Sequence, residues 1–164
     1  MAWLEKVIDW LTKAQAFIAG IALAAMILLV CANIILRQIY KPIPGTFELV
    51  ALFGAVATAF ALSFTQAKHM HIAVDLLVDR FSEHTRRWLK LINGIICAVF
   101  FALAAWQITS WSLVLINEGE LTETLQIPFY PFTLAVAFGC ALLSLMFLQT
   151  VLRMLFPQQT EEAS

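Results

Sequence analysis

The sequence predicts an all-α integral membrane protein with four transmembrane helices, and two observations support this fold class. Hydrophobic residues make up 62% of the 164 positions and charged residues only 13%, about half of the roughly 25% found in soluble domains. The charged residues also separate four long uncharged runs, which are 14–36, 49–67, 91–117 and 124–152. Each run is about as long as, or longer than, the roughly 20 residues with which a helix crosses a bilayer.

We expect one membrane domain over residues 1–164 and a polar tail at 153–164. The transmembrane helices are expected at 14–36, 46–67, 91–117 and 129–152. Helices are favoured over strands because the runs are far longer than the roughly 10-residue alternating strands of a membrane barrel. The first run is expected to be a membrane anchor and not a cleaved signal peptide. Glu5 and Asp9 precede it, whereas a signal peptide begins with a basic segment, and Arg37 ends it as in an anchor.

The distribution of lysine and arginine predicts the orientation. If both termini are cytoplasmic, eight of the ten basic residues fall on the cytoplasmic side and two on the outer side. The positive-inside rule therefore predicts cytoplasmic N and C termini. The net charge of -1 excludes a global basic field that would attract nucleic acid.

Two segments have the amphipathic pattern of helices that lie on a membrane surface. Residues 1–13 place their apolar side chains on one helical face, which consists of Trp3, Leu4, Val7, Ile8 and Leu11. Residues 71–81 repeat the pattern with Val74, Leu77, Val78 and Phe81, while Asp75 and Asp79 fall on the other side. We expect an N-terminal interfacial helix and a cytoplasmic surface helix. The second either continues into the third span or ends before a new start capped by Ser82.

No metal, cofactor or catalytic site is expected. His69 and His71 are two residues apart, so they point to different faces of a helix and do not form a set of three or four metal ligands. No histidine lies within the four runs to bind an intramembrane haem. The runs contain no Asp, Glu, Lys, Arg or His, whereas ion-coupled transporters normally carry an ionisable site near the middle of the membrane. This chain is therefore not expected to move a substrate by itself.

The polar residues inside the runs have a simpler interpretation than a pore lining. We expect interhelical hydrogen bonds from Asn33, Thr58, Asn93, Gln107, Thr109 and Ser110. Small residues at four-residue spacing, such as Gly20 and Ala24, Gly94 and Ala98, or Ala135 and Gly139, predict close helix contacts.

Charged residues flank the turn "KPIPGT", 41–46, that joins the first two spans. Arg37 ends the first span and Glu48 opens the second, so an ion pair across this hairpin is geometrically easy. The alternative is that the two charges are solvated independently. Pro128 and Pro131 lie on either side of the expected start of the fourth span, and a proline at a helix start removes no backbone donor that the helix needs.

The chain resembles the small membrane subunit of TRAP transporters, the DctQ type. The resemblance is carried by "NIILRQIY", "PGTFELV", "HMHIAVDLL" and "TETLQIPFYPF", in this order and over nearly the whole chain. The matching positions are Asn33, Arg37, Glu48, His71, Asp75, Thr124, Leu125 and Pro128.

The resemblance implies a non-enzymatic subunit of a tripartite uptake system in the bacterial inner membrane. A periplasmic binding protein would capture an organic acid anion, and a large polytopic subunit would import it, usually with sodium. The small subunit would brace the large one, and its surface helix 71–81 would anchor it to membrane lipid. The outer loop with Glu118, Glu120 and Glu123 would then either steer a basic patch of the binding protein or be merely solvated.

Two other classes of protein remain as alternatives. A stand-alone four-helix transporter needs an acid in the membrane, and Glu48 is the one candidate. A membrane-anchor subunit of a redox enzyme is disfavoured by the positions of the histidines. The substrate stays open between a dicarboxylate, sialic acid and another organic acid.

Overall fold

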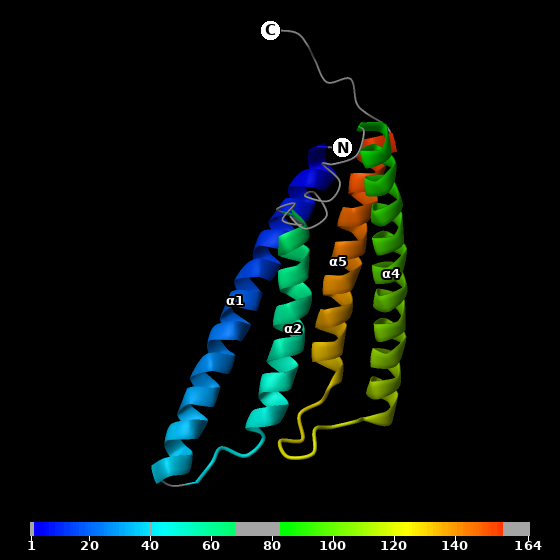
Figure 1. Ribbon diagram of the computed structural model, residues 1–164. Coiled ribbons are helices and arrows are strands. Elements are labelled where there is room, and N and C mark those ends of the chain that lie inside the picture. Colours follow the sequence, from blue (N-terminus) through cyan, green and yellow to red (C-terminus); the bar gives the residue numbers. More distant parts are fainter. Residues whose placement is uncertain (1, 40, 68–82, 156–164) are drawn as a thin grey trace.

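The structure is a computed structural model that describes residues 2–39, 41–67 and 83–155 (Figure 1). These residues form four long helices, which are α1 (Ala2–Ile39), α2 (Thr46–Ala67), α4 (Glu83–Glu118) and α5 (Tyr130–Leu155). Each helix is long and apolar enough to cross a membrane. The predicted all-α membrane fold with four spans is confirmed.

The helices start and stop where the chain has turn residues. Gly119 follows α4 with a φ of 65°, and its backbone N–H donates to the carbonyl of Leu115 (3.0 Å), which is a common helix end. Pro131 lies in the first turn of α5, where its missing N–H leaves no bond unmade. Thr46 opens α2, and its hydroxyl donates to the carbonyl of Ile43 (2.8 Å).

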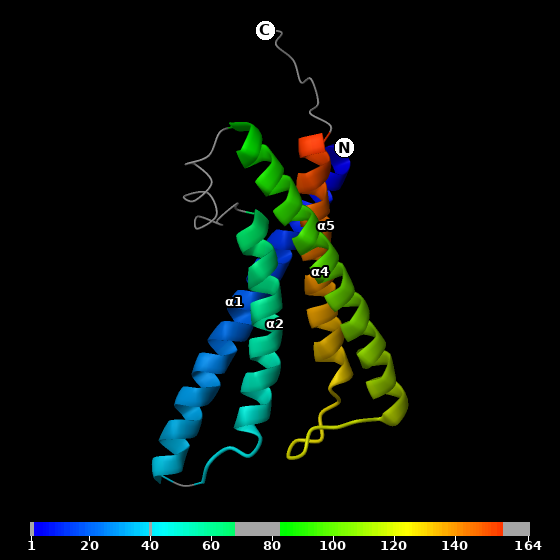
Figure 2. The ribbon, with the colours of Figure 1, turned by 45° about the vertical axis from the view of Figure 1, so that its right-hand side comes forward.

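The four helices lie side by side in one layer, in the order α1, α2, α5 and α4 (Figure 1). Helix α5 has α2 on one side and α4 on the other. Figure 2 shows that α4 crosses α5 at an angle, so this order is seen there toward the loop end. The start of α1 also contacts α5, where the Thr12 hydroxyl donates to the sulfur of Met146 (3.9 Å). The start of α1 and the end of α5 lie at one end of the layer, here called the terminal end. The segments 41–45 and 119–129 lie at the opposite end, here called the loop end.

Small residues and serines hold neighbouring helices together. A Cβ added to Gly139 of α5 would lie 3.1 Å from the Cβ of Ala59 in α2, so these helices are in close contact. The buried Ser63 hydroxyl donates to the carbonyl of Gly139 across the same interface (3.1 Å). Between α5 and α4, Ser144 donates to the carbonyl of Ala98 (2.9 Å). The predicted close contacts therefore occur inside this chain at these positions, but Gly20 has nothing within 4 Å.

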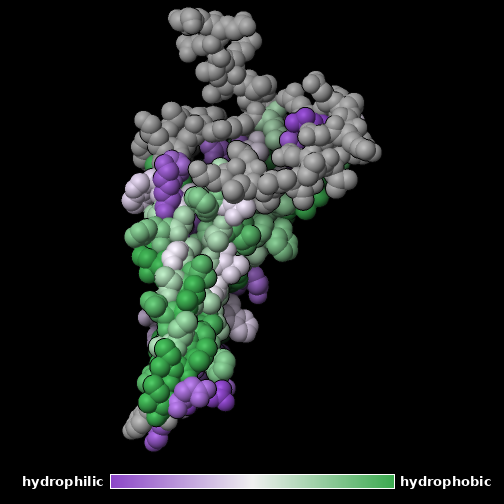
Figure 3. All heavy atoms as spheres, turned by 60° about the vertical axis from the view of Figure 1, so that its left-hand side comes forward, coloured by the Kyte–Doolittle hydropathy of each residue, from purple (hydrophilic) through white to green (hydrophobic). Residues whose placement is uncertain are grey.

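An open layer leaves many apolar side chains exposed. On α1 these include Phe17, Ile21, Leu28 and Ile35, of which Phe17 and Leu28 are 73% and 70% exposed. Figure 3 shows a face that is hydrophobic over most of its length, with hydrophilic residues gathered near its lower tip. Such a surface must be covered by lipid or by another membrane protein.

Several sequence predictions fall outside what the structure describes. Segment 71–81 with His71, Asp75, Leu77 and Phe81 lies outside the described residues, as does most of the tail 153–164. Helix α1 continues without a break from residue 13, the end of the predicted interfacial helix, into residue 14, the start of the predicted first span. The interfacial position of residues 1–13 and the cytoplasmic location of the termini stay predictions.

Candidate functional site

The loops at the loop end of the layer are joined to each other by a few specific contacts. We call this contact the loop junction and define it by Asn33, Gly45, Glu48, Thr122 and Leu125. It connects the α1–α2 hairpin to the segment between α4 and α5. The loop junction therefore joins the pair α1 and α2 to the pair α5 and α4 at the loop end. It does so in addition to the direct packing of α2 on α5.

Glu48 forms the polar part of the loop junction. Its Oε1 accepts a hydrogen bond from the backbone N–H of Thr124 (2.7 Å), and its Oε2 accepts one from the backbone N–H of Leu125 (3.2 Å). Hydrogen bonds to an ionised carboxylate are stronger than those between neutral groups. Glu48 also lies in the first turn of α2, where the helix dipole favours a negative charge.

Gly45 forms the apolar part of the loop junction. Its φ is 71°, in the left-handed region that glycine adopts without a steric penalty. A Cβ at this position would collide with the side chain of Leu125, which packs directly over the glycine. Both the backbone conformation and the close approach of Leu125 therefore require glycine here.

The segment between α4 and α5 is a tight hairpin organised by Thr122, which is 2% exposed. Its backbone N–H donates to the carbonyl of Ile127 (2.9 Å), and its side-chain oxygen accepts from the N–H of Ile127 (3.0 Å). Leu121 and Pro128 pair beside it as a single antiparallel bridge. The amides that reach Glu48 are thus presented by a loop that is already ordered by its own hydrogen bonds.

Asn33 fixes the other loop. Its Oδ1 accepts a hydrogen bond from the backbone N–H of Ile43 (2.8 Å), which ties the α1–α2 connection back to the end of α1. The next residues, Pro44 and Gly45, then turn the chain into α2. The predicted interhelical role of Asn33 is replaced by this bond to the loop backbone.

The structure does not form the predicted ion pair between Arg37 and Glu48. Both carboxylate oxygens of Glu48 are bound by backbone amides from the α4–α5 segment. Arg37 is exposed and forms no ion pair with any residue that the structure describes. The reason is that the backbone amides of Thr124 and Leu125 already provide donors to both carboxylate oxygens, so the carboxylate does not need the arginine as a partner.

Of the other predicted site residues at the loop end, some take part in the loop junction and others do not. Glu118, Glu120 and Glu123 are exposed, so the acidic residues face away from the packed part of the loop. Pro128 closes the hairpin through its bridge to Leu121. Thr124 and Leu125 contribute through their backbone amides.

The chemistry of the loop junction is that of a structural clamp. It offers one carboxylate, already bound to two amides, and neither a nucleophile nor an adjacent base. In the part of the chain that the structure describes, no group of three or more His, Cys, Asp or Glu is placed to hold a metal ion. The arrangement is suited to positioning the loops.

Sequence reasoning missed two members of the loop junction. Gly45 was recognised only as part of a turn, and Thr122 was not singled out. The pattern Pro-Gly-Thr before a span was the available signal for a left-handed glycine. No comparable signal exists for Thr122, because its hydroxyl acts on a backbone group five residues away.

Comparisons with known proteins agree with this architecture. Residues 26–156 match the family described as "Tripartite ATP-independent periplasmic transporters, DctQ component". The C4-dicarboxylate TRAP transporter small permease protein DctQ of Vibrio cholerae serotype O1 (strain ATCC 39315 / El Tor Inaba N16961) is similar over 181 aligned positions. The two chains are 26% identical there, and the alignment covers 90% of this chain and 74% of the relative. No solved structure gives a significant match. Since the family match spans most of the chain, from the second half of α1 to the end of α5, this chain belongs to the DctQ component family of the TRAP transporters, multi-pass proteins of the bacterial inner membrane.

Proposed function

We propose that this chain braces the large membrane subunit of a binding-protein-dependent importer that takes up an organic acid anion with sodium. The family supports a role as the small subunit of a tripartite system. The relative from Vibrio cholerae is named for C4-dicarboxylate, which supports a small carboxylate as the class of substrate.

The observation that carries the proposal is the open layer of helices. A path for an anion must be enclosed by protein, but the described helices lie in one row and expose apolar side chains on their surfaces. The four uncharged runs also contain no Asp, Glu, Lys, Arg or His that would couple transport to an ion. The layer is suited to covering one side of a larger membrane protein.

In the proposed orientation, the loop end faces the periplasm and the terminal end faces the cytoplasm. The charge distribution supports it, because eight of the ten basic residues lie before the first span, between the second and third spans or after the fourth span in the sequence. The loop junction then holds the α4–α5 hairpin in a fixed position on the periplasmic side, where a binding protein approaches.

Transport is expected to require the complete system. The chain reconstituted alone in vesicles should show no sodium-dependent uptake of the anion, whereas vesicles with the large subunit, this chain and the binding protein should take it up. The measurement is uptake of radiolabelled substrate under an imposed sodium gradient. Coupled uptake by the isolated chain would contradict the proposal, and so would full uptake by the large subunit and binding protein without it.

Replacing Glu118, Glu120 and Glu123 with glutamine should weaken the approach of the binding protein. These exposed acids create a negative local potential that attracts a basic patch, mainly through the association rate. The expected result is a higher binding-protein concentration at half-maximal uptake, a weaker dependence on salt and a nearly unchanged maximal rate. Unchanged values would show that the loop is merely solvated and that the contact lies elsewhere.

A further inference from the structure

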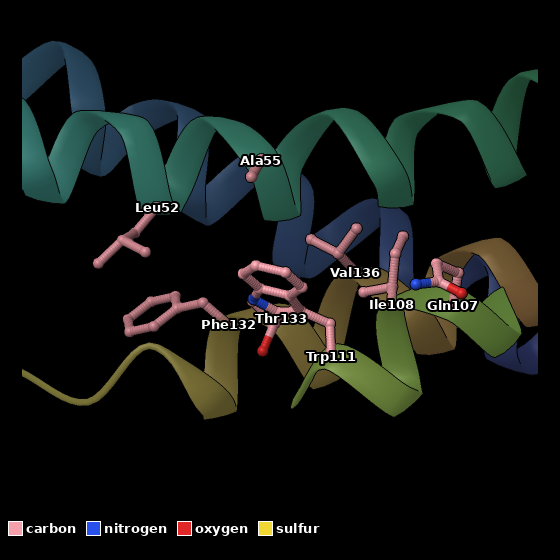
Figure 4. Close-up of a pocket in the computed structure, with 8 residues that line it drawn as sticks. All are labelled: Leu52, Ala55, Gln107, Ile108, Trp111, Phe132, Thr133 and Val136. Atoms are coloured by element: carbon pink, nitrogen blue, oxygen red, sulfur yellow. The ribbon is translucent and has the colours of Figure 1, made fainter. Parts of the chain in front are cut away.

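An open groove runs along one face of the layer, between α2 and α4 and over α5 (Figure 4). Its floor is formed by Phe132 and Val136 of α5, and its walls by Leu52 and Ala55 of α2 and by Gln107 and Trp111 of α4. The groove exists because α2 and α4 are separated by α5 and make no extensive contact with each other. Its volume is about 410 Å³, which a membrane environment must fill.

Gln107 is the unusual residue of this groove, because its carbon atoms are part of the wholly apolar lining while its amide lies outside that lining. Its side chain is exposed, and it makes no hydrogen bond with any residue that the structure describes. Helix α4 ends at Glu118, so at a rise of 1.5 Å per residue Gln107 lies about 16 Å from that end. In a hydrocarbon core about 30 Å thick, this places an unpaired amide near the middle of the membrane.

The wall formed by α2 permits close approach of another helix. Ala51, Ala55 and Thr58 are exposed and follow one another at spacings of four and three residues, so they share one helical face. Small residues in such a row let helix backbones come close together in membranes. Thr58 lies about 18 Å from the start of α2, at nearly the depth of Gln107.

We propose that this groove is the seat of a transmembrane helix of the large subunit, and that this helix presents a hydrogen-bonding side chain to Gln107. The inference rests on the proposed bracing function and names the face through which it acts. A lipid acyl chain has the shape to fill the groove but offers the amide neither a donor nor an acceptor, and unpaired polar groups in hydrocarbon are costly. A second copy related by a two-fold axis through the groove would oppose one concave surface to the same concave surface and leave the space unfilled.

Two tryptophans of α4 provide a matched test by photocrosslinking. Trp111 lies in the groove and is 59% exposed, while Trp106 is 74% exposed and lies about 140° away around the helix. Each is replaced in turn by benzoyl-phenylalanine in the complete complex, and the membranes are irradiated. The expected result is an adduct with the large subunit from position 111 and none from position 106.

The outcomes separate this inference from the proposed function. If the wild-type chain co-purifies with the large subunit but position 111 yields only lipid adducts, a dimer of this chain, or no more large-subunit adduct than position 106, the groove assignment is wrong and the bracing function stands. If the wild-type chain neither co-purifies with the large subunit nor is needed for uptake, the bracing function fails and the inference fails with it.

A substitution tests the hydrogen bond itself. Gln107→Leu keeps the size of the side chain and removes the amide, so the fraction of large subunit retained during detergent dilution should correspond to a roughly three- to twentyfold weaker association. Thr109→Val is the control, because the Thr109 hydroxyl donates to the carbonyl of Ala105 within its own helix (2.7 Å). Equal retention of the large subunit by wild type and Gln107→Leu would overturn the assignment of Gln107.

Discussion

Replacing Gly45 with alanine is expected to lower the stability of the chain by about 1–3 kcal/mol, because two separate penalties act at this position. A non-glycine residue is strained at a φ of 71°, and the new Cβ collides with the side chain of Leu125. The loop junction must therefore open, or Leu125 must leave its place over α2. The measurement is the midpoint of thermal unfolding of the purified chain in detergent.

The two penalties can be separated with a second substitution. Leu125→Ala shortens the side chain that meets the new Cβ, so the double variant Gly45→Ala/Leu125→Ala should lose less than the two single losses combined. The remaining loss would belong to the backbone conformation.

Gly20→Ala is the control for the effect of a glycine substitution alone. Gly20 lies within α1 with nothing within 4 Å of an added Cβ, so alanine should be neutral or stabilising there. A Gly45→Ala variant as stable as Gly20→Ala would contradict the geometry of the loop junction.

The four spans were predictable because charge-free length is a strong signal in a membrane protein, but the order of the helices was not. In a soluble protein an apolar stripe shows which face of a helix is buried. Here Phe17 and Leu28 are as apolar as the buried Val56 and Phe60, yet they are exposed, since lipid accepts apolar side chains as readily as protein does. Sequence periodicity therefore gives little information about which helices are neighbours.

The hydrogen-bond partners of the polar residues in the spans were also not predictable from the sequence. Interhelical hydrogen bonds were expected from several of them, but the residues that donate such bonds include Ser63, Ser112 and Ser144 instead. Thr109 bonds within its own helix, and Gln107 has no partner among the described residues. A polar residue in a span indicates that a hydrogen bond is needed in the membrane. The partner in that bond depends on the order of the helices and on other chains.

Glu48 was predicted as a residue of interest, but neither alternative considered for it, an ion pair with Arg37 or a solvated charge, included its observed partners. An acid at the start of a span invites pairing with a nearby arginine, and Arg37 lies only a short loop away. The actual donors are backbone amides of Thr124 and Leu125, 76 and 77 residues further along the chain. Every residue except proline carries such a donor, so no sequence pattern distinguishes these two.

Substituting Glu48 should therefore loosen the α4–α5 hairpin and should do so independently of Arg37. Glu48→Ala leaves the amides of Thr124 and Leu125 without their acceptor, and both should exchange hydrogen for deuterium severalfold faster than in the wild type. Glu48→Gln is the more informative variant. Its single carbonyl oxygen accepts from one amide, while its NH₂ group faces the other donor. One of the two amides should thus keep part of its protection.

The measurement is hydrogen–deuterium exchange of the peptide that covers residues 120–129, with Glu120→Gln as the control. Glu120 is an exposed acid of the same segment, and its side chain makes no hydrogen bond to either amide, since both are bound to Glu48. The control variant should exchange like the wild type. If Arg37→Ala accelerated exchange as much as Glu48→Ala, the ion pair would be the relevant contact. If the Glu48 variants exchanged like the wild type, the carboxylate would not hold the hairpin, and its order would come from Thr122 and the packing of Leu125 on Gly45.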